Sequence, residues 1–296
     1  MNLLLLGKDG QVGRQLGHAL PQAASRVCLG RNELDLANLE ALEGALRQYN
    51  PHVIVNAAAY TAVDKAEGDE AAARLVNTDA VAVMAGHAAR TGALLVHYST
   101  DYVFDGEQQA PYMETDRANP QTAYGRSKLA GEQAITASGC DAIVFRTSWV
   151  YSVHGGNFVK TILRLAKERE TLDVVADQHG APTSAALIAQ VTVRAIAARQ
   201  AGSFRAGLYH LAPTGETTWH ALACEVVARA KAAGVSLKLD PREIRAIPSE
   251  AYPAVAKRPR NSRLATGLLS SELGLGLPHW KIGVHGVVDR LCEEGS

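Results

Sequence analysis

The sequence predicts an α/β protein, in which a doubly wound parallel sheet of the Rossmann type is followed by a smaller C-terminal region. Short apolar runs of strand length alternate with helical stretches through residues 1–150, and a glycine-rich turn directly follows the first run. Such alternation is typical of parallel sheets covered by helices on both faces. After Tyr151 the pattern loosens. We therefore expect two closely packed units, residues 1–150 and 151–296, with some segments of the second returning to the first.

The individual elements follow from the spacing of apolar residues. Val12, Leu16 and Leu20 have helical spacing, so a helix is expected to open at the glycine turn. Apolar runs predict strands over residues 3–6, 25–29, 53–55, 94–98, 142–146 and 207–211. Further helices are expected over residues 39–49, about 70–91, 127–138, 158 to about 170, and 225–232.

Gly7, Gly10 and Gly13 make up the glycine-rich turn between the first strand and the first helix. Glycines let the backbone turn sharply and approach a pyrophosphate, whose charge then lies at the helix N-terminus. The spacing is looser than the GxGxxG fingerprint, and a turn of this kind can also be purely structural. Its position at the start of an alternating chain favours a dinucleotide site.

The carboxyl ends of the predicted strands are expected to form the ligand-binding edge of the sheet. The glycine turn, residues 56–59 and Ser99-Thr100 all follow predicted strands, so they fall on that edge. The alanines after Asn56 have two interpretations: close packing between helix and strand, or a wall against a flat cofactor.

The end of the second strand bears on the choice of cofactor. NAD sites usually carry an acidic residue about 20 residues after the glycines. Here Gly30 takes that place and Arg31 follows, where it could bind a 2′-phosphate through two hydrogen bonds. Arg31 can equally be a solvated loop charge, and Glu33 is close by. The pattern favours NADPH, with NADH possible.

Tyr124 and Lys128 stand four residues apart, and Thr100 lies upstream of them. On a helix this spacing puts both side chains on one face. The ammonium of Lys128 is then expected to lower the Tyr124 pKa from about 10 toward neutrality. With the Thr100 hydroxyl as a third contact, the set is a candidate acid/base for carbonyl–alcohol chemistry. The spacing alone is weak evidence, since surface pairs often show it.

The composition indicates which partners and which compartment the protein has. Lys+Arg and Asp+Glu both count 30, so nothing in the charge balance favours nucleic acid or an anionic membrane as a partner. The 4 cysteines are dispersed, which suits a reducing compartment and gives no metal-type cluster. The apolar run at residues 3–6 is too short for a signal peptide or a membrane span. We expect a cytoplasmic protein without a metal site.

A basic segment, residues 248–263, carries Arg258, Arg260 and Arg263 and is expected to be too polar for the core. One interpretation is a solvated loop. The other is a clamp on the diphosphate of a sugar nucleotide, since arginine binds phosphate through paired hydrogen bonds.

Together these residues resemble the extended short-chain dehydrogenase/reductase superfamily and, within it, the dTDP-4-dehydrorhamnose reductase family. The likeness covers nearly the whole chain. The matching motifs are Gly7-x-x-Gly10-Gln11-Val12-Gly13, Asn56-Ala57-Ala58-Ala59-Tyr60-Thr61-Ala62-Val63-Asp64, Tyr98-Ser99-Thr100-Asp101-Tyr102-Val103-Phe104-Asp105-Gly106, Tyr124-Gly125-x-Ser127-Lys128, Arg146-Thr147-Ser148-Trp149-Val150-Tyr151, Asp177-Gln178-x-Gly180-x-Pro182-Thr183 and Arg258-Pro259-Arg260-Asn261-Ser262. The first and fourth occur throughout the superfamily, while the third and the last are more specific.

The resemblance implies NADPH-dependent reduction of the C4 keto group of dTDP-4-dehydro-β-L-rhamnose to dTDP-L-rhamnose, within carbohydrate and lipopolysaccharide biosynthesis. Tyr124 would protonate the sugar oxygen, Thr100 would bond the same oxygen, and Lys128 would hold the nicotinamide ribose and depress the Tyr124 pKa. Residues 1–150 would form the NAD(P)-binding domain, and residues 151–296 mainly the sugar-nucleotide-binding domain.

Two sets of contacts complete the expectation. The cofactor set comprises Gly7, Gly10, Gln11, Val12, Gly13, Gly30, Arg31, Asp35, Leu36, Ala59, Tyr60, Thr61, Tyr98, Tyr124 and Lys128. The substrate set comprises Thr100, Asp101, Trp149, Asn157, Arg258 and Asn261. Trp149 is either a core aromatic near a strand end or an indole that packs on the sugar.

Other functions remain open at this point. A sugar-nucleotide dehydratase needs an Asp-Glu pair after the threonine, but this chain has Asp101-Tyr102. A C4 epimerase recycles a tightly held NAD, which the missing acid at Gly30 disfavours. A non-catalytic NADP-binding subunit, as in the regulatory β subunit of methionine adenosyltransferase, resembles the same family. The complete set of Tyr124, Lys128 and Thr100 disfavours that interpretation.

The resemblance also bears on assembly. Some members of the family form dimers bridged by magnesium through carboxylates, and the matching places here hold Gln15, Ala186 and Arg290. Magnesium prefers oxygen ligands that include carboxylates, although Glu293-Glu294 could serve instead. We expect a protein without that metal bridge, which is a monomer or a weak homodimer through another surface.

Overall fold

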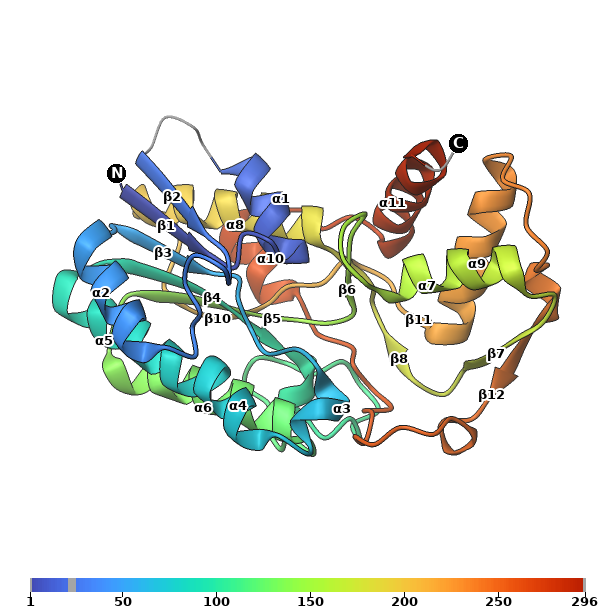
Figure 1. Ribbon diagram of the computed structural model, residues 1–296, viewed down its shortest axis with the longest axis horizontal. Helices are drawn as coiled ribbons and strands as arrows, with labels where there is room; N and C mark the ends of the chain where they lie inside the picture. Colours follow the sequence, from blue (N-terminus) through green and yellow to red (C-terminus); the bar gives the residue numbers. More distant parts are fainter. Residues whose placement is uncertain (1, 21–24, 295–296) are drawn as a thin grey trace.

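A computed structural model describes residues 2–20 and 25–294 (Figure 1). Its centre is a six-stranded parallel sheet in the order β2-β1-β3-β4-β5-β10. The strands are β1 (Asn2–Leu6), β2 (Ser25–Leu29), β3 (Val53–Asn56), β4 (Leu94–Thr100), β5 (Ala142–Thr147) and β10 (Gly207–His210). The chain places β2 on one side of β1 and β3 on the other, so the strand order reverses between β1 and β3.

Helices cover both faces of this sheet. One face packs against α1 (Gln11–Ala19), α8 (Ala185–Gln200) and α10 (Gly267–Leu273), and the other against α2 (Leu39–Tyr49), α5 (Ala80–Thr91) and α6 (Ala123–Ser138). The apolar run of β1 supplies both of these contacts. Leu3 and Leu5 pack in the layer with α1, α8 and α10, and Leu4 and Leu6 pack in the layer with α2, α5 and α6. Alternate side chains of a strand point to opposite faces. The predicted doubly wound α/β class is confirmed.

A smaller unit lies beside the sheet region, on the right in Figure 1. Its apolar core lies among α7 (Phe158–Glu168), α9 (Trp219–Ala232), α11 (Trp280–Glu294) and the parallel pair of β7 (Leu172–Val175) and β12 (Ile244–Ile247). Two short pairs adjoin it: β6 (Val150–Tyr151) with β9 (Thr183–Ser184), and β8 (His179–Gly180) with β11 (Thr217–Thr218). Meanwhile α8, β10 and α10 return to the sheet region from the second half of the chain.

Short helical segments lie between these elements. They are α3 (Val63–Ala66), α4 (Glu70–Arg74), η1 (Leu75–Asp79), η2 (Asp101–Val103), η3 (Pro241–Glu243) and η4 (Ser249–Ala251). The single helix expected over residues 70–91 is α4, η1 and α5 in succession, and η1 is a π-helical turn. Such turns are rare and often occur at functional sites.

Two expectations were wrong. The helix expected from residue 127 begins at Ala123, because the Thr122 hydroxyl accepts a hydrogen bond from Gly125 N–H and caps it. The segment 248–263 is not uniformly exposed, since Ala256, Asn261 and Ser262 are buried. The earlier start matters for the site, because it puts Tyr124 on the same helix as Lys128.

Candidate active site

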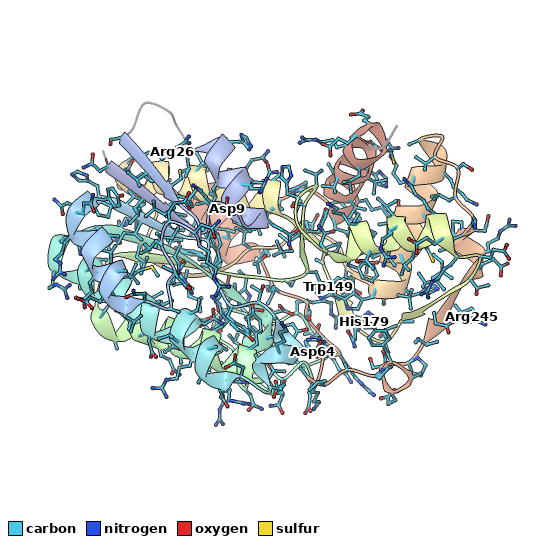
Figure 2. All side chains as sticks on the ribbon, in the orientation of Figure 1. Asp9, Arg26, Asp64, Trp149, His179 and Arg245 are labelled. Atoms are coloured by element: carbon cyan, nitrogen blue, oxygen red, sulfur yellow. The ribbon has the colours of Figure 1, made fainter. Side chains whose placement is uncertain are left out.

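A cavity of about 920 Å³ lies at the carboxyl ends of β1, β3 and β4. Doubly wound sheets bind ligands at this edge, where the strand order reverses. Most of the sequence-predicted residues line it: Gly7, Gly10, Gln11, Val12, Gly30, Arg31, Asp35, Leu36, Ala59, Tyr60, Thr61, Tyr98, Thr100, Asp101, Tyr124, Lys128 and Trp149. Figure 2 places Asp9 over the sheet and Trp149 at the junction with the smaller unit. The cavity therefore extends from the glycine turn to the junction of the two units.

The glycine turn at one end of the cavity suits an anion. Gly10 is the N-cap of α1, no side chain caps it, and the first turn carries no acidic residue. The free N–H groups and the helix dipole therefore favour a phosphate group there. Gly7 has a φ of 81°, and an added Cβ would lie 2.6 Å from the Ala58 nitrogen. Gly13 packs beneath Gly7 and is not among the lining residues, so it shapes the turn rather than the cavity wall.

The end of β2 carries charges of both signs. Glu33 accepts a hydrogen bond from Gly30 N–H at 2.9 Å and forms an ion pair with Lys8. Arg31 is exposed over 85% of its side chain, and its Nε lies 3.6 Å from an Asp35 carboxylate oxygen. An ion pair this exposed holds the arginine weakly. Sequence reasoning did not anticipate the pair of Lys8 and Glu33, and Lys8 is not among the residues that line the cavity.

Tyr124, Thr100 and Lys128 meet on one wall of the cavity. The Thr100 hydroxyl donates to Asp101 Oδ1 at 3.0 Å and accepts from Tyr102 N–H. The ring of Tyr124 meets that of Tyr102 edge-on, with centroids 5.6 Å apart. These three candidate catalytic side chains come from β4 and α6, so the sheet edge and the start of α6 bring them together.

The expected lowering of the Tyr124 pKa is wrong. Burial raises the pKa of Tyr124, the Thr100 hydroxyl lowers it, and the negative charge of Asp101 raises it further. Burial has the largest effect because a phenolate in this wall would lose its hydration. Burial also raises the pKa of Asp101, to about 6. Tyr124 is therefore a protonated phenol at neutral pH, which is the form that donates a proton.

The side chain of Lys128 contacts a residue that the sequence did not indicate. Its Nζ lies 3.1 Å from Nε2 of His97, a buried histidine of β4. Burial lowers the pKa of Lys128 to about 8, although the nearby charge of Glu132 acts in the opposite direction. In the sequence, His97 was visible only as one polar residue inside a strand.

Trp149 occupies the junction between the two units (Figure 2). Its φ of 49° is unusual for a bulky residue and marks local strain. Its indole stacks on that of Trp219, with centroids 3.6 Å apart. An added Cβ at Gly180 would lie 2.7 Å from the Trp149 ring, so only glycine leaves room for it. One face of Trp149 is thus taken by Trp219, a residue that sequence reasoning missed.

A second cavity, of about 760 Å³, is lined by much of the basic segment. Arg258, Arg260 and Arg263 all line it, together with Gln178 and His179. Each arginine has a carboxylate partner: Asp64 for Arg258 at 2.5 Å, Glu250 for Arg260 and Glu216 for Arg263. The Arg258–Asp64 pair joins the basic segment to α3 of the sheet unit. Figure 2 labels Asp64 and His179 in this part of the molecule.

The side-chain amides of two predicted substrate contacts make hydrogen bonds within the protein. Asn157 caps α7, and its amide donates to Gln11 Oε1 and to Ser152 O, so both N–H bonds are used. It lies outside the lining of both cavities. Asn261 lines the second cavity, but its amide donates to Gln108 O and Ala110 O. Both side chains hold neighbouring segments together around the site, and in the structure neither amide has a free N–H.

Two further observations concern the described residues as a whole. Among residues 2–20 and 25–294, no three or more His, Cys, Asp or Glu side chains are grouped as metal ligands. Within the same ranges, no helix is long and apolar enough to cross a membrane.

The doubly wound sheet, the uncapped glycine turn and the cavity at the strand reversal define a dinucleotide-binding α/β protein. The chain belongs to the family described as RmlD substrate binding domain, whose model matches residues 1–293. The dTDP-4-dehydrorhamnose reductase of Burkholderia thailandensis is 48% identical over 288 residues, covering 96% of this chain and 97% of the relative. That of Escherichia coli K12 is 45% identical over 295 residues, covering 98% of both. The resemblance inferred from the motifs is confirmed.

Solved structures agree with this assignment. The dTDP-4-dehydrorhamnose reductase of Bacillus anthracis, in complex with NADP, superposes with a TM-score of 0.89 at 32% identity. The match covers 97% of this chain and 98% of that one. The ortholog from Clostridium acetobutylicum also gives a TM-score of 0.89, at 34% identity, with 98% and 99% coverage.

Proposed function

We propose that this protein reduces the C4 keto group of dTDP-4-dehydro-β-L-rhamnose with NADPH, giving dTDP-L-rhamnose and NADP⁺. The observation that carries the proposal is the position of the Tyr124 phenol next to Thr100, in a cavity that begins at the glycine turn. Burial there raises the pKa of Tyr124, which favours the proton-donating form. Family membership narrows the reaction to this sugar nucleotide, because the relatives that cover nearly the whole chain are reductases of that name.

Bound NADPH supplies the hydride that adds to C4. Tyr124 transfers its hydroxyl proton to the sugar oxygen as negative charge develops there. The Thr100 hydroxyl, which donates to Asp101 Oδ1 in the structure, turns to donate its hydrogen bond to that sugar oxygen when substrate is bound. The raised pKa of Tyr124 supports this direction, since the acid form is present at neutral pH. Lys128 lies on the same wall and binds the nicotinamide ribose.

We assign the pyrophosphate of the cofactor to the N-terminus of α1 and its adenosine end to the end of β2. The nucleotide part of the substrate is assigned to the second cavity, where Arg258, Arg260 and Arg263 supply cations for its diphosphate. Residues 1–150 then act as the cofactor domain and residues 151–296 mainly as the substrate domain. The Trp149–Trp219 pair lies between them, where the sugar must sit. We also assign the protein to the cytoplasm, where both small molecules are available.

The test is the loss of NADPH absorbance when purified protein receives the 4-keto sugar nucleotide. We expect turnover with NADPH and slower or equal turnover with NADH. Formation of dTDP-L-rhamnose is checked by mass spectrometry and by the configuration at C4. Binding of NADPH without any turnover would identify a non-catalytic subunit and refute the proposal.

A further inference from the structure

One sequence motif, Asp177-Gln178-x-Gly180-x-Pro182-Thr183, has no part in the function assigned above, and several of its residues contact Trp149. The Thr183 N–H donates to the Trp149 carbonyl oxygen at 3.2 Å, beside the pairing of β6 with β9. Gly180 lies against the indole, since an added Cβ would be 2.7 Å from the ring. The motif therefore holds both the backbone and the ring of Trp149.

Trp219, the first residue of α9, covers one face of the Trp149 indole, with ring centroids 3.6 Å apart and planes 15° from parallel. The antiparallel register of β8 with β11 continues so that Gln178 lies opposite Trp219. The Trp219 ring also packs on Phe158, with centroids 4.6 Å apart. Trp219 is not among the lining residues of either cavity. It can therefore act on a ligand only through the residues that it contacts.

A chain of hydrogen bonds fixes the plane of Trp219. Its indole N–H donates to Gln178 Oε1 at 3.1 Å, and Gln178 Nε2 donates to the Ser249 hydroxyl at 2.9 Å. The Ser249 hydroxyl in turn donates to Asp177 Oδ1 at 2.6 Å. An indole N–H can only donate and a carboxylate can only accept, so every direction in this chain is determined. Gln178 is buried and uses both ends of its amide, so turning the amide would leave polar atoms unpaired.

Trp149 needs these contacts because its backbone is in the left-handed region. A φ of 49° is unfavourable for a bulky residue and persists only where the surroundings determine it. Trp149 lines the first cavity, whereas Gln178 and Ser249 line the second. The contacts therefore connect the place assigned to the sugar with the place assigned to the nucleotide part of the substrate.

We propose that Trp219 is a positioning residue for Trp149, and that Gln178 holds Trp219 in the orientation that sets the Trp149 indole against the sugar. The proposal rests on the function assigned above, in which the sugar lies at the junction of the two units. Trp219 then contributes to sugar binding without touching the ligand. Binding of NADPH, and of the nucleotide without its sugar, does not depend on Trp219, because both use other parts of the two cavities.

The stacked pair can be detected in the free protein. Two indoles this close give an exciton couplet in the circular dichroism spectrum, and the chain has 3 tryptophans, of which the third is Trp280. We expect the couplet in the wild type and its loss in both Trp149→Phe and Trp219→Phe. Trp280→Phe is the matched control and should keep the couplet, since Trp280 is buried in the same apolar core and lines neither cavity. A couplet that is missing from the wild type, or that survives Trp219→Phe, overturns the proposal.

Ligand binding tests the role at the sugar. In calorimetric titrations, Trp219→Leu should weaken dTDP-L-rhamnose about 5–30-fold, because a tryptophan at the centre of a binding site commonly contributes this much. The dissociation constants of dTDP and NADPH should stay within about twofold. Trp219→Phe keeps a ring and loses only the N–H, so it should weaken dTDP-L-rhamnose about 2–5-fold. Trp280→Leu, the same change in the same core, should leave all three constants within about twofold.

The outcomes separate this proposal from the assigned function. Absence of NADPH oxidation in the wild type refutes the function, whereas equal weakening of dTDP-L-rhamnose and dTDP in Trp219→Leu, or no weakening of either, overturns the positioning role. If Trp219→Leu does not fold, Gln178→Leu decides through the circular dichroism couplet. That variant removes the acceptor of the Trp219 N–H, so the couplet should weaken, and an unchanged couplet overturns the proposal.

Discussion

Tyr124→Phe tests the proposed proton donor most directly, because it removes one hydroxyl and leaves the ring. Burial raises the pKa of Tyr124, so the wild-type phenol is protonated throughout the neutral range. The substitution therefore removes the donor at every working pH. The Phe ring keeps the edge-on contact with Tyr102, whose centroid lies 5.6 Å away. We expect the fold and NADPH binding to change little.

The expected fall in kcat can be estimated from the role of Tyr124 as a general acid. A positioned general acid contributes about 10²–10⁴-fold to the rate. At 1.36 kcal/mol for each tenfold change, this corresponds to about 2.7–5.4 kcal/mol of activation free energy. We expect kcat to fall by that factor while the NADPH dissociation constant stays within about twofold. Steady-state NADPH oxidation gives the first quantity, and fluorescence titration with NADPH gives the second.

Tyr102→Phe is the matched control for this experiment. Its ring adjoins that of Tyr124, and burial raises the pKa of this phenol to about 12, yet its hydroxyl accepts from Arg258 Nη1 at 3.4 Å. Removing this hydroxyl should affect KM for the sugar nucleotide more than kcat, because Arg258 lines the second cavity. Tyr124→Phe with most of its turnover, or equal losses of kcat in both variants, would contradict the assignment of Tyr124.

Three further predictions concern the cofactor, stability and assembly. Arg31→Ala should weaken the binding of NADPH by about 1–3 kcal/mol and the binding of NADH by less, because a charged hydrogen bond to the 2′-phosphate is lost. Equal weakening in binding titrations of both cofactors would show that Arg31 is only a loop charge. Glu132→Ala leaves the buried Arg146 guanidinium unpaired, so the free energy of unfolding in urea should fall by about 3–5 kcal/mol. Glu168→Ala, which breaks an exposed pair, should cost only about 0.3–0.5 kcal/mol, and similar losses in the two variants would refute the reasoning. Sedimentation should give the same mass with and without EDTA, and an EDTA-sensitive dimer would show that a metal bridges the protein.

The order of strands and helices in the first half could be predicted because local pattern and tertiary packing agree there. The helix expected over residues 39–49 is α2 with the same bounds. Asn38 caps its start through a hydrogen bond from Ala41 N–H, and Asn50 ends it in the left-handed conformation. The edge of the sheet that holds the cavity also followed from sequence, because parallel strands end together and the residues after them must meet.

The proton states of the site could not be predicted, because they depend on desolvation. The Tyr-x-x-x-Lys spacing put two side chains on one helical face, but it carried no information about what covers that face. In the structure burial has the largest effect on both groups: it raises the pKa of Tyr124 against the hydrogen bond from Thr100, and it lowers the pKa of Lys128 against the charge of Glu132. The partner of Lys128, His97, comes from a strand 31 residues away along the chain.

The sequence by itself determined the fold class, the glycine turn and the set of candidate catalytic residues, since each depends on residue types at short spacing. Tertiary structure decided which of the candidates are free to act. Asn157 and Asn261 satisfy backbone and side-chain partners from distant segments, and Trp149 stacks on Trp219. Those partners are brought together only by the packing of the smaller unit against the sheet. Hydrogen bonds and ring contacts between remote segments are absent from any local pattern, so only the folded chain reveals them.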